Sequence, residues 1–355
     1  NDAPEKLSNK GADLARVLPI NSVLVTCIGN LGRTAINKIP VAFNQQINAI
    51  IPSKNIDGRF LFYQAQSPEF RNQLEDLSAA TTVAIVNKGK FETIQISLPP
   101  LPEQQAIVAK IEELLSDLEN GKQQLQTALQ QLKVYRQSLL KWAFEGLKEE
   151  KTIEEITEDH SIGLVRSNKE QNYNQKGVPY IKMNNVNMDG HVDFKKVVYV
   201  DVNPEEKIKY SLKKEDILIN TRNSIELVGK TGVVREEKPN CVFNNNLLRI
   251  RTKREYDSLF IGYQLIGPWL RKQMTKEKKS TTNVCALYQR DIFPLKIKVT
   301  CFKEQQLIVS ELENKLTVCD KIEETISQSL QQAETLRQSI LKKAFEGKLI
   351  NYELK

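Results

Sequence analysis

The sequence is poor in the residues that build metal centres and disulfide frameworks. Its 355 residues include five cysteines, none of them in a C-x-x-C pair, and two histidines, His160 and His191. A zinc site or a set of structural disulfides is therefore not expected. Thiols that remain free suit a reducing compartment, so we expect a cytoplasmic protein. A histidine-based catalytic triad is likewise not supported.

Long apolar runs and cofactor-binding motifs are also missing. No stretch reaches the roughly 20 apolar residues that cross a membrane, and no signal peptide is visible. We find no glycine-rich dinucleotide loop, no G-x-x-x-x-G-K-[ST] phosphate loop and no Asn-Pro-Pro-aromatic motif of an amino-methyltransferase. Val228 to Thr231 keeps only the last three letters of a phosphate loop, and we interpret it as a turn. We therefore expect no cofactor, no metal, no membrane association and no catalytic activity in this chain.

Positive charge is present but confined to one segment. Lys and Arg outnumber Asp and Glu by 28 to 21 in residues 148–302, whereas the balance is 15 to 14 in residues 1–147 and 8 to 9 in residues 303–355. A modest excess of positive charge is commonly just part of a solvated protein surface. Its confinement to one globular segment nevertheless favours a polyanionic partner.

A long internal repeat dominates the sequence. Glu103 to Gly146 aligns without a gap with Glu304 to Gly347, and both copies begin with Glu-Gln-Gln and close with Ala-Phe-Glu-Gly. Each copy carries apolar residues at alternating steps of four and three, which is the heptad seam of a coiled coil. The predicted seam positions are Ile107, Ile111, Leu114, Leu118, Gly121, Leu125, Ala128, Leu132, Tyr135, Leu139 and Trp142 in the first copy, and Ile308, Leu312, Cys319, Ile322, Ile326, Ala333, Leu336 and Ile340 in the second.

Both copies are predicted to be helices of about 40 residues, or about 60 Å at 1.5 Å per residue. Pro99, Pro100 and Pro102 prevent the first from extending upstream, and Gly146 and Gly347 stand where a helix ends. A helix with such a row of apolar side chains is not stable alone in water. We therefore expect the two helices to pack on each other, antiparallel and with pseudo-twofold symmetry. The intervening segment then folds at one tip and the preceding segment at the other. The alternative is two helices packed separately on unrelated cores.

The globular segments repeat more faintly, and the first is shorter. Residues 152–200 have no counterpart ahead of Asn1, so by comparison of the halves the first domain lacks about 45 to 50 residues. Either the sequence is a shortened form or those residues lie outside it. The corresponding segments are Leu31 to Ala35 with Val228 to Gly232, Phe43 to Gln46 with Phe243 to Asn246, Thr81-Thr82 with Thr281-Thr282, and Ile94 to Leu98 with Leu295 to Val299.

The sequence therefore predicts an α+β protein. Two strand-rich α/β domains, the first incomplete on its N-terminal side, are separated by two long helices that form an antiparallel coiled coil. The predicted boundaries are 1–98 for the first domain, 99–146 for the first helix, 147–298 for the second domain, and 299–355 for the second helix and tail. Ser258 to Met274 has helical spacing that Gly267-Pro268 must kink or divide.

Polar loops in basic surroundings are the candidates for contacts to DNA. Ile219 to Ser224 ends a strand and offers an arginine, which can grip O6 and N7 of guanine, and amides, which can do the same with N6 and N7 of adenine. Arg271 to Lys279 is a basic run that precedes Ser280 to Asn283, and lysines beside small hydroxyls suit phosphate oxygens. Taken singly, Asn and Thr in loops usually form turns and a lysine run is usually solvated, but the combined pattern favours DNA.

These features resemble a known family. Two domains of one type each lead into a long helix, which opens with E-Q-Q, preceded by P-x-x in the first copy, and closes with L-R-Q-S-I-L-K-K-A-F-E-G-K-L (Leu336 to Leu349) in the second. This arrangement is similar to the specificity subunit of a type I restriction-modification system. G-V-P-Y-I-K-M-N-N-V (Gly177 to Val186), D-I-L-I-N-T-R-N-S (Asp216 to Ser224) and E-L-V-G-K-T-G (Glu226 to Gly232) are similar to segments common in that family's target-recognition domains. The resemblance covers essentially the whole chain, and the shortened first domain is its one departure.

The resemblance implies a non-catalytic subunit that binds double-stranded DNA. Two target-recognition domains, held at opposite ends of a two-helix spacer, would each read one half of a split sequence, and the helix length would set the gap between halves. Methyltransferase subunits, two of them, would bring S-adenosylmethionine and modify adenine, and restriction motor subunits would join them. The outer faces of both helices would dock the methyltransferase.

We assign Arg222, Asn223 and Lys182 to base or groove contacts, and Lys230, Lys278, Lys279 and Thr281 to phosphates. The full set of predicted DNA-contacting residues is Lys182, Asn184, Asn185, Arg222, Asn223, Ser224, Lys230, Lys278, Lys279, Thr281 and Thr282 in the second domain, and Asn30, Arg33, Asn44, Gln45, Gln46, Thr81 and Thr82 in the first.

Two other classes of function remain open. One is a coiled-coil scaffold whose basic domain binds nucleic acid without sequence preference, which a salt-controlled competition between specific and random DNA would reveal. The other is an enzyme with an unrecognised site, which methyl transfer by the purified chain alone would establish.

Overall fold

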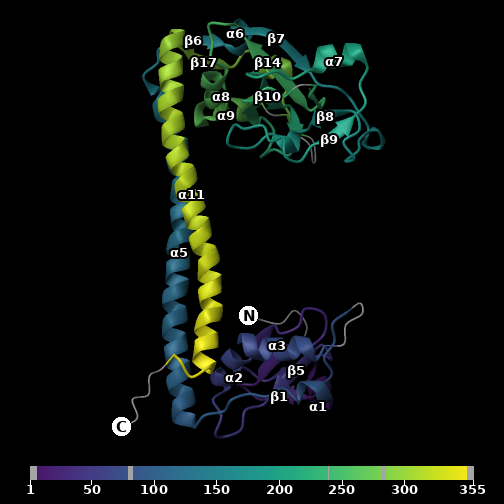
Figure 1. Ribbon diagram of the computed structural model, residues 1–355, viewed down its shortest axis with the longest axis vertical. Helices are drawn as coiled ribbons and strands as arrows, with labels where there is room; N and C mark the ends of the chain where they lie inside the picture. The colour runs from purple at the N-terminus through teal and green to yellow at the C-terminus, as the bar shows by residue number, and fades with distance from the viewer. Residues whose placement is uncertain (1–5, 79–82, 239, 278, 281–284, 350–355) are drawn as a thin grey trace. The chain divides into compact units, whose positions relative to one another are not determined.

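The computed structural model describes residues 6–78, 83–238, 240–277, 279–280 and 285–349, with the backbone alone at residues 276, 277, 279 and 280. The chain divides into two compact units, unit 1 (residues 1–129 and 324–355) and unit 2 (residues 130–323). The boundary passes through both long helices, α5 (Leu101–Glu145) and α11 (Phe302–Phe345), so each unit contains a stretch of each (Figure 1). The predicted mixture of helices and strands around two long helices is confirmed. None of the described helices is both long and apolar enough to cross a membrane.

Unit 1 is built on a three-stranded antiparallel sheet in the order β3-β2-β5, with a separate β1-β4 pair. The helix α2 packs on β2 and β3, and Leu61 and Leu74 join Val23 and Val25 in the core. Besides α5, the elements are α1 (Asn9–Leu14), β1 (Val17–Leu18), β2 (Val23–Thr26), β3 (Thr34–Ile36), β4 (Val41–Ala42), β5 (Ile47–Ile50), α2 (Gly58–Gln64), α3 (Pro68–Asp76) and α4 (Lys88–Phe91).

Unit 2 contains a four-stranded antiparallel sheet in the order β12-β10-β14-β7, with α8 packed on it. Smaller sheets, β13-β8-β9, β11-β16-β15 and β17-β6, surround it. Its first elements are β6 (Glu149–Thr152), α6 (Ile153–Ile156), β7 (Thr157–Ile162), η1 (Asn168–Glu170), β8 (Val178–Ile181), η2 (Met183–Asn185), β9 (Val198–Val200) and α7 (Pro204–Tyr210). They are followed by β10 (Ile217–Asn220), β11 (Arg222–Asn223), β12 (Thr231–Val233), β13 (Val242–Phe243), β14 (Leu247–Thr252), α8 (Ser258–Ile266), α9 (Pro268–Glu277), β15 (Lys279–Ser280), β16 (Cys285–Ala286), α10 (Gln289–Ile292) and β17 (Lys296–Val299).

The two units repeat one internal arrangement. The sheet β3-β2-β5 of unit 1 corresponds to β12-β10-β14 of unit 2, and the helix pair α2 and α3 corresponds to α8 and α9. The predicted division of Ser258 to Met274 is confirmed, because α8 ends at Ile266, Gly267 is extended and α9 begins at Pro268. Proline suits the first position of a helix, where its missing N–H is not needed.

The Glu-Gln-Gln motif attaches the start of each long helix to its own unit. In unit 2 the fully buried Gln305 accepts the N–H of Asp257 on Oε1 at 2.8 Å. Its Nε2 donates to the carbonyls of Glu255 at 3.1 Å and Thr300 at 2.8 Å. Asp257 in turn caps α8 by accepting the N–H of Leu259 at 2.9 Å. One glutamine therefore holds the beginning of α11 to the beginning of α8.

Gln104 does the same in unit 1. Its Oε1 accepts the N–H of Asp57 at 2.9 Å, and its Nε2 donates to the carbonyls of Asn55 at 3.3 Å and Pro99 at 2.7 Å. Asp57 caps α2 through the N–H of Arg59. The repeated motif is thus a structural one, and its role in both units is to join a long helix to the core.

The long helices pack on each other in both units. In unit 1 the first turns of α5, at Ile107 and Ile111, share a core with Leu341 and Ala344 near the end of α11. Lys122 pairs with Glu334 at 2.6 Å in the same unit. Because the beginning of one helix meets the end of the other, the pair is antiparallel, as predicted.

In unit 2 the contact is between the last turns of α5 and the first turns of α11. Leu132 and Leu139 share a core with Leu312 and Cys319, and Arg136 pairs with Asp320 at 2.7 Å. The direction is again antiparallel, since the end of α5 meets the start of α11.

Four predicted seam positions are wrong. Tyr135 and Trp142 are 53% and 51% exposed, and Ile322 and Leu336 are also exposed. A strict seven-residue repeat places these four residues at the helix contact, but a helix of 3.6 residues per turn drifts by about 20° per heptad. Near its end α5 instead buries Leu140 and Phe144, which face the core of unit 2 as well as the partner helix, and the ring of Phe144 packs edge-on against that of Phe260 at 5.3 Å.

Candidate nucleic-acid interface

The loop that joins β10 to β12 holds four of the predicted contact residues, Arg222, Asn223, Ser224 and Lys230. At its base the N–H of Thr221 donates to the carbonyl of Asn246 at 2.8 Å, and β11 pairs antiparallel with β16. Within the loop the Oδ1 of Asn223 accepts the N–H of Ser224 at 2.9 Å. Arg222 is exposed, so a firmly attached loop presents its guanidinium to solvent.

The turn η2 adjoins this loop. The Nζ of Lys230 donates to the carbonyl of Met183 at 3.0 Å, which ties the end of the β10–β12 loop to η2. Asn184 on that turn is exposed, and the Nζ of Lys182 donates to Oε1 of Gln171 at 2.8 Å. The structure therefore brings together the candidates from two stretches that lie far apart in the sequence.

Two of the predicted contact residues are buried as well as hydrogen-bonded inside these loops. The Nδ2 of the buried Asn185 donates to the carbonyls of Asp193 at 3.0 Å and Lys196 at 2.9 Å. Lys230 is 8% exposed and bonds to Met183 as described. Both side chains hold the loops in place, and we do not include them in the proposed DNA-contacting set.

Arg271 of α9 joins the same region and was not singled out from the sequence. Its Nη1 lies 3.4 Å from the carbonyl of Val228 and its Nη2 lies 3.5 Å from Sδ of Met188. Burial lowers the pKa of Arg271, and burial together with the charge of Arg271 lowers the pKa of Lys230. Neither cation forms an ion pair with a carboxylate in the described part of the chain. No ion pair in the described part of the chain neutralises these two cations, which favours a polyanionic partner.

The basic run from Arg271 to Lys279 was the only sequence signal for this arginine. Its contacts are made with residues 43 and 83 positions away, and such distant partners cannot be read from a local pattern.

Unit 1 presents the equivalent loops with its own polar side chains. Asn30 and Arg33 lie in the turn between β2 and β3, and both are exposed. Asn44, Gln45 and Gln46 form the turn before β5 and are also exposed. The predicted candidates of unit 1 that the structure describes therefore lie at one end of the strands, where β2 ends and β3 and β5 begin.

The same backbone contact joins the two loops in each unit. In unit 1 the N–H of Cys27, directly after β2, donates to the carbonyl of Gln46 at 2.8 Å. In unit 2 the N–H of Thr221, directly after β10, donates to the carbonyl of Asn246, also at 2.8 Å. Each unit thus holds a strand-end loop beside an Asn- and Gln-rich turn.

The remaining predicted residues are not described. Lys278, Thr281, Thr282, Thr81 and Thr82 lie outside the described residues, and Lys279 is described for its backbone alone, in β15.

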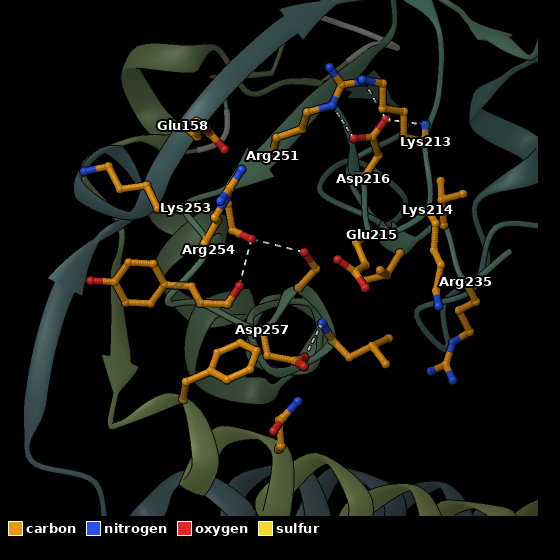
Figure 2. Close-up of a pocket in the computed structure, with 18 of the residues that line it drawn as sticks. Glu158, Lys213, Lys214, Glu215, Asp216, Arg235, Arg251, Lys253, Arg254 and Asp257 are labelled. Carbon is orange, nitrogen blue, oxygen red and sulfur yellow. Dashed lines mark hydrogen bonds and ion pairs between the residues drawn. The ribbon is translucent and has the colours of Figure 1, made fainter. Parts of the chain in front are cut away.

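A pocket of about 650 Å³ lies at the other ends of the unit 2 strands (Figure 2). Its lining includes residues that precede β10 and residues that follow β12 and β14, whereas the polar loops follow β10 and precede β12 and β14. Arg251 and Asp216 point toward each other there and form a two-pronged ion pair at 2.7 and 3.2 Å (Figure 2). This pocket is separate from the candidate interface. The described residues contain no cluster of three or more His, Cys, Asp or Glu side chains that could hold a metal ion.

Comparison with known proteins gives one consistent family. A model of the type I restriction modification DNA specificity domain matches residues 6–127 and 147–332. The EcoKI specificity subunit of Escherichia coli K12 is 26% identical over 352 residues, which cover 94% of this chain and 76% of that protein. The MjaVIII specificity subunit of Methanocaldococcus jannaschii is 26% identical, covering 93% of this chain and 79% of that protein.

Solved structures share the fold. A chain from the structural study of assembly and conformational transition of the type I R-M system gives a TM-score of 0.75 at 21% identity, covering 94% of this chain and 83% of that chain. The HsdS subunit of Thermoanaerobacter tengcongensis gives a TM-score of 0.58 at 20% identity, covering 94% of this chain and 83% of that chain. Because the family model matches twice and spans most of the chain, this chain belongs to the family of type I restriction-modification DNA specificity subunits.

Proposed function

We propose that this chain reads a split DNA target, one half with each unit, and that it positions methyltransferase subunits on that target. The observation that carries the proposal is the repetition of the candidate interface. Both units hold a strand-end loop beside an amide-rich turn through the same backbone bond. Each loop also exposes one arginine, Arg33 in unit 1 and Arg222 in unit 2.

The contacts are divided between base reading and phosphate binding. Arg222 and Asn223, together with Lys182, are suited to base edges because a guanidinium or an amide can form two bonds with one base. Arg271 supplies positive charge beside them, and phosphate contacts from the basic run of α9 would fix the register without selecting bases. Asn44, Gln45 and Gln46 would take the amide role in unit 1.

The catalytic steps belong to partner subunits in this proposal. Two methyltransferase subunits would carry S-adenosylmethionine, and restriction motor subunits would join the complex. Apolar side chains are exposed on the helices of unit 2, Tyr135 and Trp142 on α5 with Val318 and Ile322 on α11, and in this proposal they contact a methyltransferase. Single exposed apolar residues are ordinary, but four on one stretch of a helix pair favour a binding surface.

The test is to co-express the chain with its methyltransferase subunits and map methylated adenines across the genome. For Arg222→Ala we expect the selectivity for one half of the target to relax, by about 1 to 3 kcal/mol for each base contact that is lost. For Arg33→Ala we expect the same loss of selectivity in the other half. Arg254→Ala, at the pocket on the opposite strand ends, is the matched control and should leave the methylated sequence unchanged. Uniform loss of methylation for Arg222→Ala, with no change in the sequence logo, would instead make Arg222 a phosphate contact. A methylated sequence that neither arginine variant alters would refute the proposed interface.

A further inference from the structure

The helices α3 and α9 take equivalent places in the two units. Both begin with proline, and both carry a glutamine five residues later, Gln73 in α3 and Gln273 in α9. Gln73 bonds the N–H and the carbonyl of Gln95 at 3.0 and 2.9 Å, and Gln273 donates to the carbonyl of Lys296 at 3.4 Å. Each helix therefore holds the segment that leads into the long helix of its unit.

An arginine of each helix lies beside a left-handed glycine of the candidate interface. Gly32, in the turn between β2 and β3, has a φ of +74°, and Gly229, in the β10–β12 loop, has a φ of +80°. A Cβ placed on Gly32 would lie 3.7 Å from Nε of Arg71, and one placed on Gly229 would lie 3.6 Å from Nη1 of Arg271. The two arginines thus occupy the same position against the loops of their units.

The charges around these two arginines differ. One turn after Arg71, the carboxylate of Glu75 lies 3.9 Å from Nε of that arginine, and the two side chains are 48% and 63% exposed. In α9 the same position is taken by Thr275, whose hydroxyl donates to the carbonyl of Arg271 at 2.8 Å. Residues 268–275 contain no Asp or Glu. A phosphate that approaches Arg71 therefore also meets a negative charge, whereas one that approaches Arg271 does not.

Arg271 keeps hydrogen-bond donors for a ligand. Its bonds to the carbonyl of Val228 and to Sδ of Met188, at 3.4 and 3.5 Å, are longer than the usual 2.7 to 3.2 Å. A guanidinium has five N–H donors, so donors remain after these two bonds. The exposed Lys272 adds a second positive charge at the position where α3 has Asn72.

We propose that the two units bind the phosphate backbone of DNA with unequal strength. Arg271 of unit 2 binds phosphate, and Glu75 prevents the equivalent Arg71 of unit 1 from doing so to the same extent. This inference rests on the proposed function, and it assigns the sequence-independent part of the binding mainly to unit 2. The half of the target that unit 1 reads then depends more on contacts to bases.

The test measures binding of the full chain to a random-sequence duplex of about 30 base pairs, because phosphate contacts carry no base identity. Fluorescence anisotropy at several salt concentrations gives the slope of the logarithm of the binding constant against the logarithm of the salt concentration, and each phosphate contact adds about 0.9 to its magnitude. Arg271→Gln should lower that magnitude by about 0.9, and Arg71→Gln by less than about 0.3. Thr275→Glu, a change at an exposed position, should act as Arg271→Gln does.

The reciprocal change in unit 1 is a gain of binding, which a folding defect cannot imitate. Glu75→Thr should strengthen binding and raise the magnitude of the slope by about 0.9, and adding Arg71→Gln should remove that gain. Glu158→Thr removes an exposed carboxylate at the pocket on the other strand ends, so it is the matched control and should leave the slope unchanged. Equal slopes for Glu75→Thr and Glu158→Thr, or equal losses for Arg71→Gln and Arg271→Gln, would overturn the inference.

Failure of this inference is distinguishable from failure of the proposed function. If the slopes show no difference between the units while Arg222→Ala still relaxes one half of the methylated sequence, only the unequal phosphate binding is wrong. A chain that does not bind the duplex at any salt concentration would contradict both.

Discussion

The glutamine that joins each long helix to its unit should be among the most costly polar residues to replace. Gln305→Ala removes three hydrogen bonds at once, to the N–H of Asp257 and to the carbonyls of Glu255 and Thr300. Each buried hydrogen bond contributes about 1 kcal/mol net, so the expected loss in the free energy of unfolding is about 3 kcal/mol. The site is fully buried, so solvent replaces these bonds poorly.

Unit 2 can be followed separately because both tryptophans of the chain, Trp142 and Trp269, belong to it. Tryptophan fluorescence during urea unfolding therefore reports on this unit. With a slope of about 2 kcal/mol per molar urea, a loss of about 3 kcal/mol lowers the midpoint by about 1.5 M. The neighbouring Gln306 is exposed, and Gln306→Ala should change stability by less than about 0.5 kcal/mol.

Gln104→Ala makes the same change in unit 1, where the same three kinds of bond are lost. It should leave the tryptophan transition of unit 2 less affected than Gln305→Ala does, while circular dichroism detects the loss of helix. A Gln305→Ala midpoint that matches Gln306→Ala would refute the reasoning, because it would mean that the three bonds add nothing net to the folded state.

Two further predictions concern single side chains of unit 2. Tyr180→Phe should lower the free energy of unfolding, measured in urea, by about 2 kcal/mol. The buried hydroxyl donates to the carbonyl of Leu164 at 2.6 Å and accepts from Nδ2 of Asn244 at 2.9 Å, and the substitution would leave both partners unpaired. A loss below about 0.5 kcal/mol would contradict this prediction. Burial raises the pKa of Cys241 to about 12 from 9.0, so in the folded chain at pH 8.5 iodoacetamide should modify the exposed Cys301 and not Cys241, as peptide mass spectrometry would show. Because the folded state keeps this proton longer than the unfolded state, its contribution to stability is present below pH 9 and is lost as the pH rises toward 12, and Cys241→Ala should lessen that loss.

Periodicity and repetition were enough to predict the helical framework. The gapless repeat identified α5 and α11, and Gly267-Pro268 correctly divided α8 from α9. Both are local signals, which depend on residues a few positions apart. Tyr135 and Trp142 were assigned wrongly because the seam rotates with the true helical period and because the end of α5 packs against α8 as well as α11.

The candidate site could be predicted only by residue type, because its geometry depends on distant contacts. Lys230 has the chemistry of a phosphate ligand, but its Nζ bonds to a carbonyl 47 residues away. Asn185 has the chemistry of a base reader, but it bonds to two carbonyls of the following loop. Arg222 was selected by the same reasoning and is exposed. The sequence does not separate these three, because burial decides whether a polar side chain of a loop is available to a ligand.

The repeated arrangement also explains why the two units can differ in the residues they expose without differing in fold. Asn44 and Asn244 close equivalent turns by accepting the N–H of the residue two positions later, at 3.1 and 2.8 Å. Asn244 is buried because its Nδ2 also donates to the hydroxyl of Tyr180 on β8, whereas no counterpart of β8 stands among the described residues of unit 1 and Asn44 is exposed. The turn is therefore set by a hydrogen bond from its own backbone to its own asparagine side chain, and the surroundings decide which amides face solvent. A fold organised in this way can change the side chains that its loops expose, while the glutamine attachments and the helix pair stay the same.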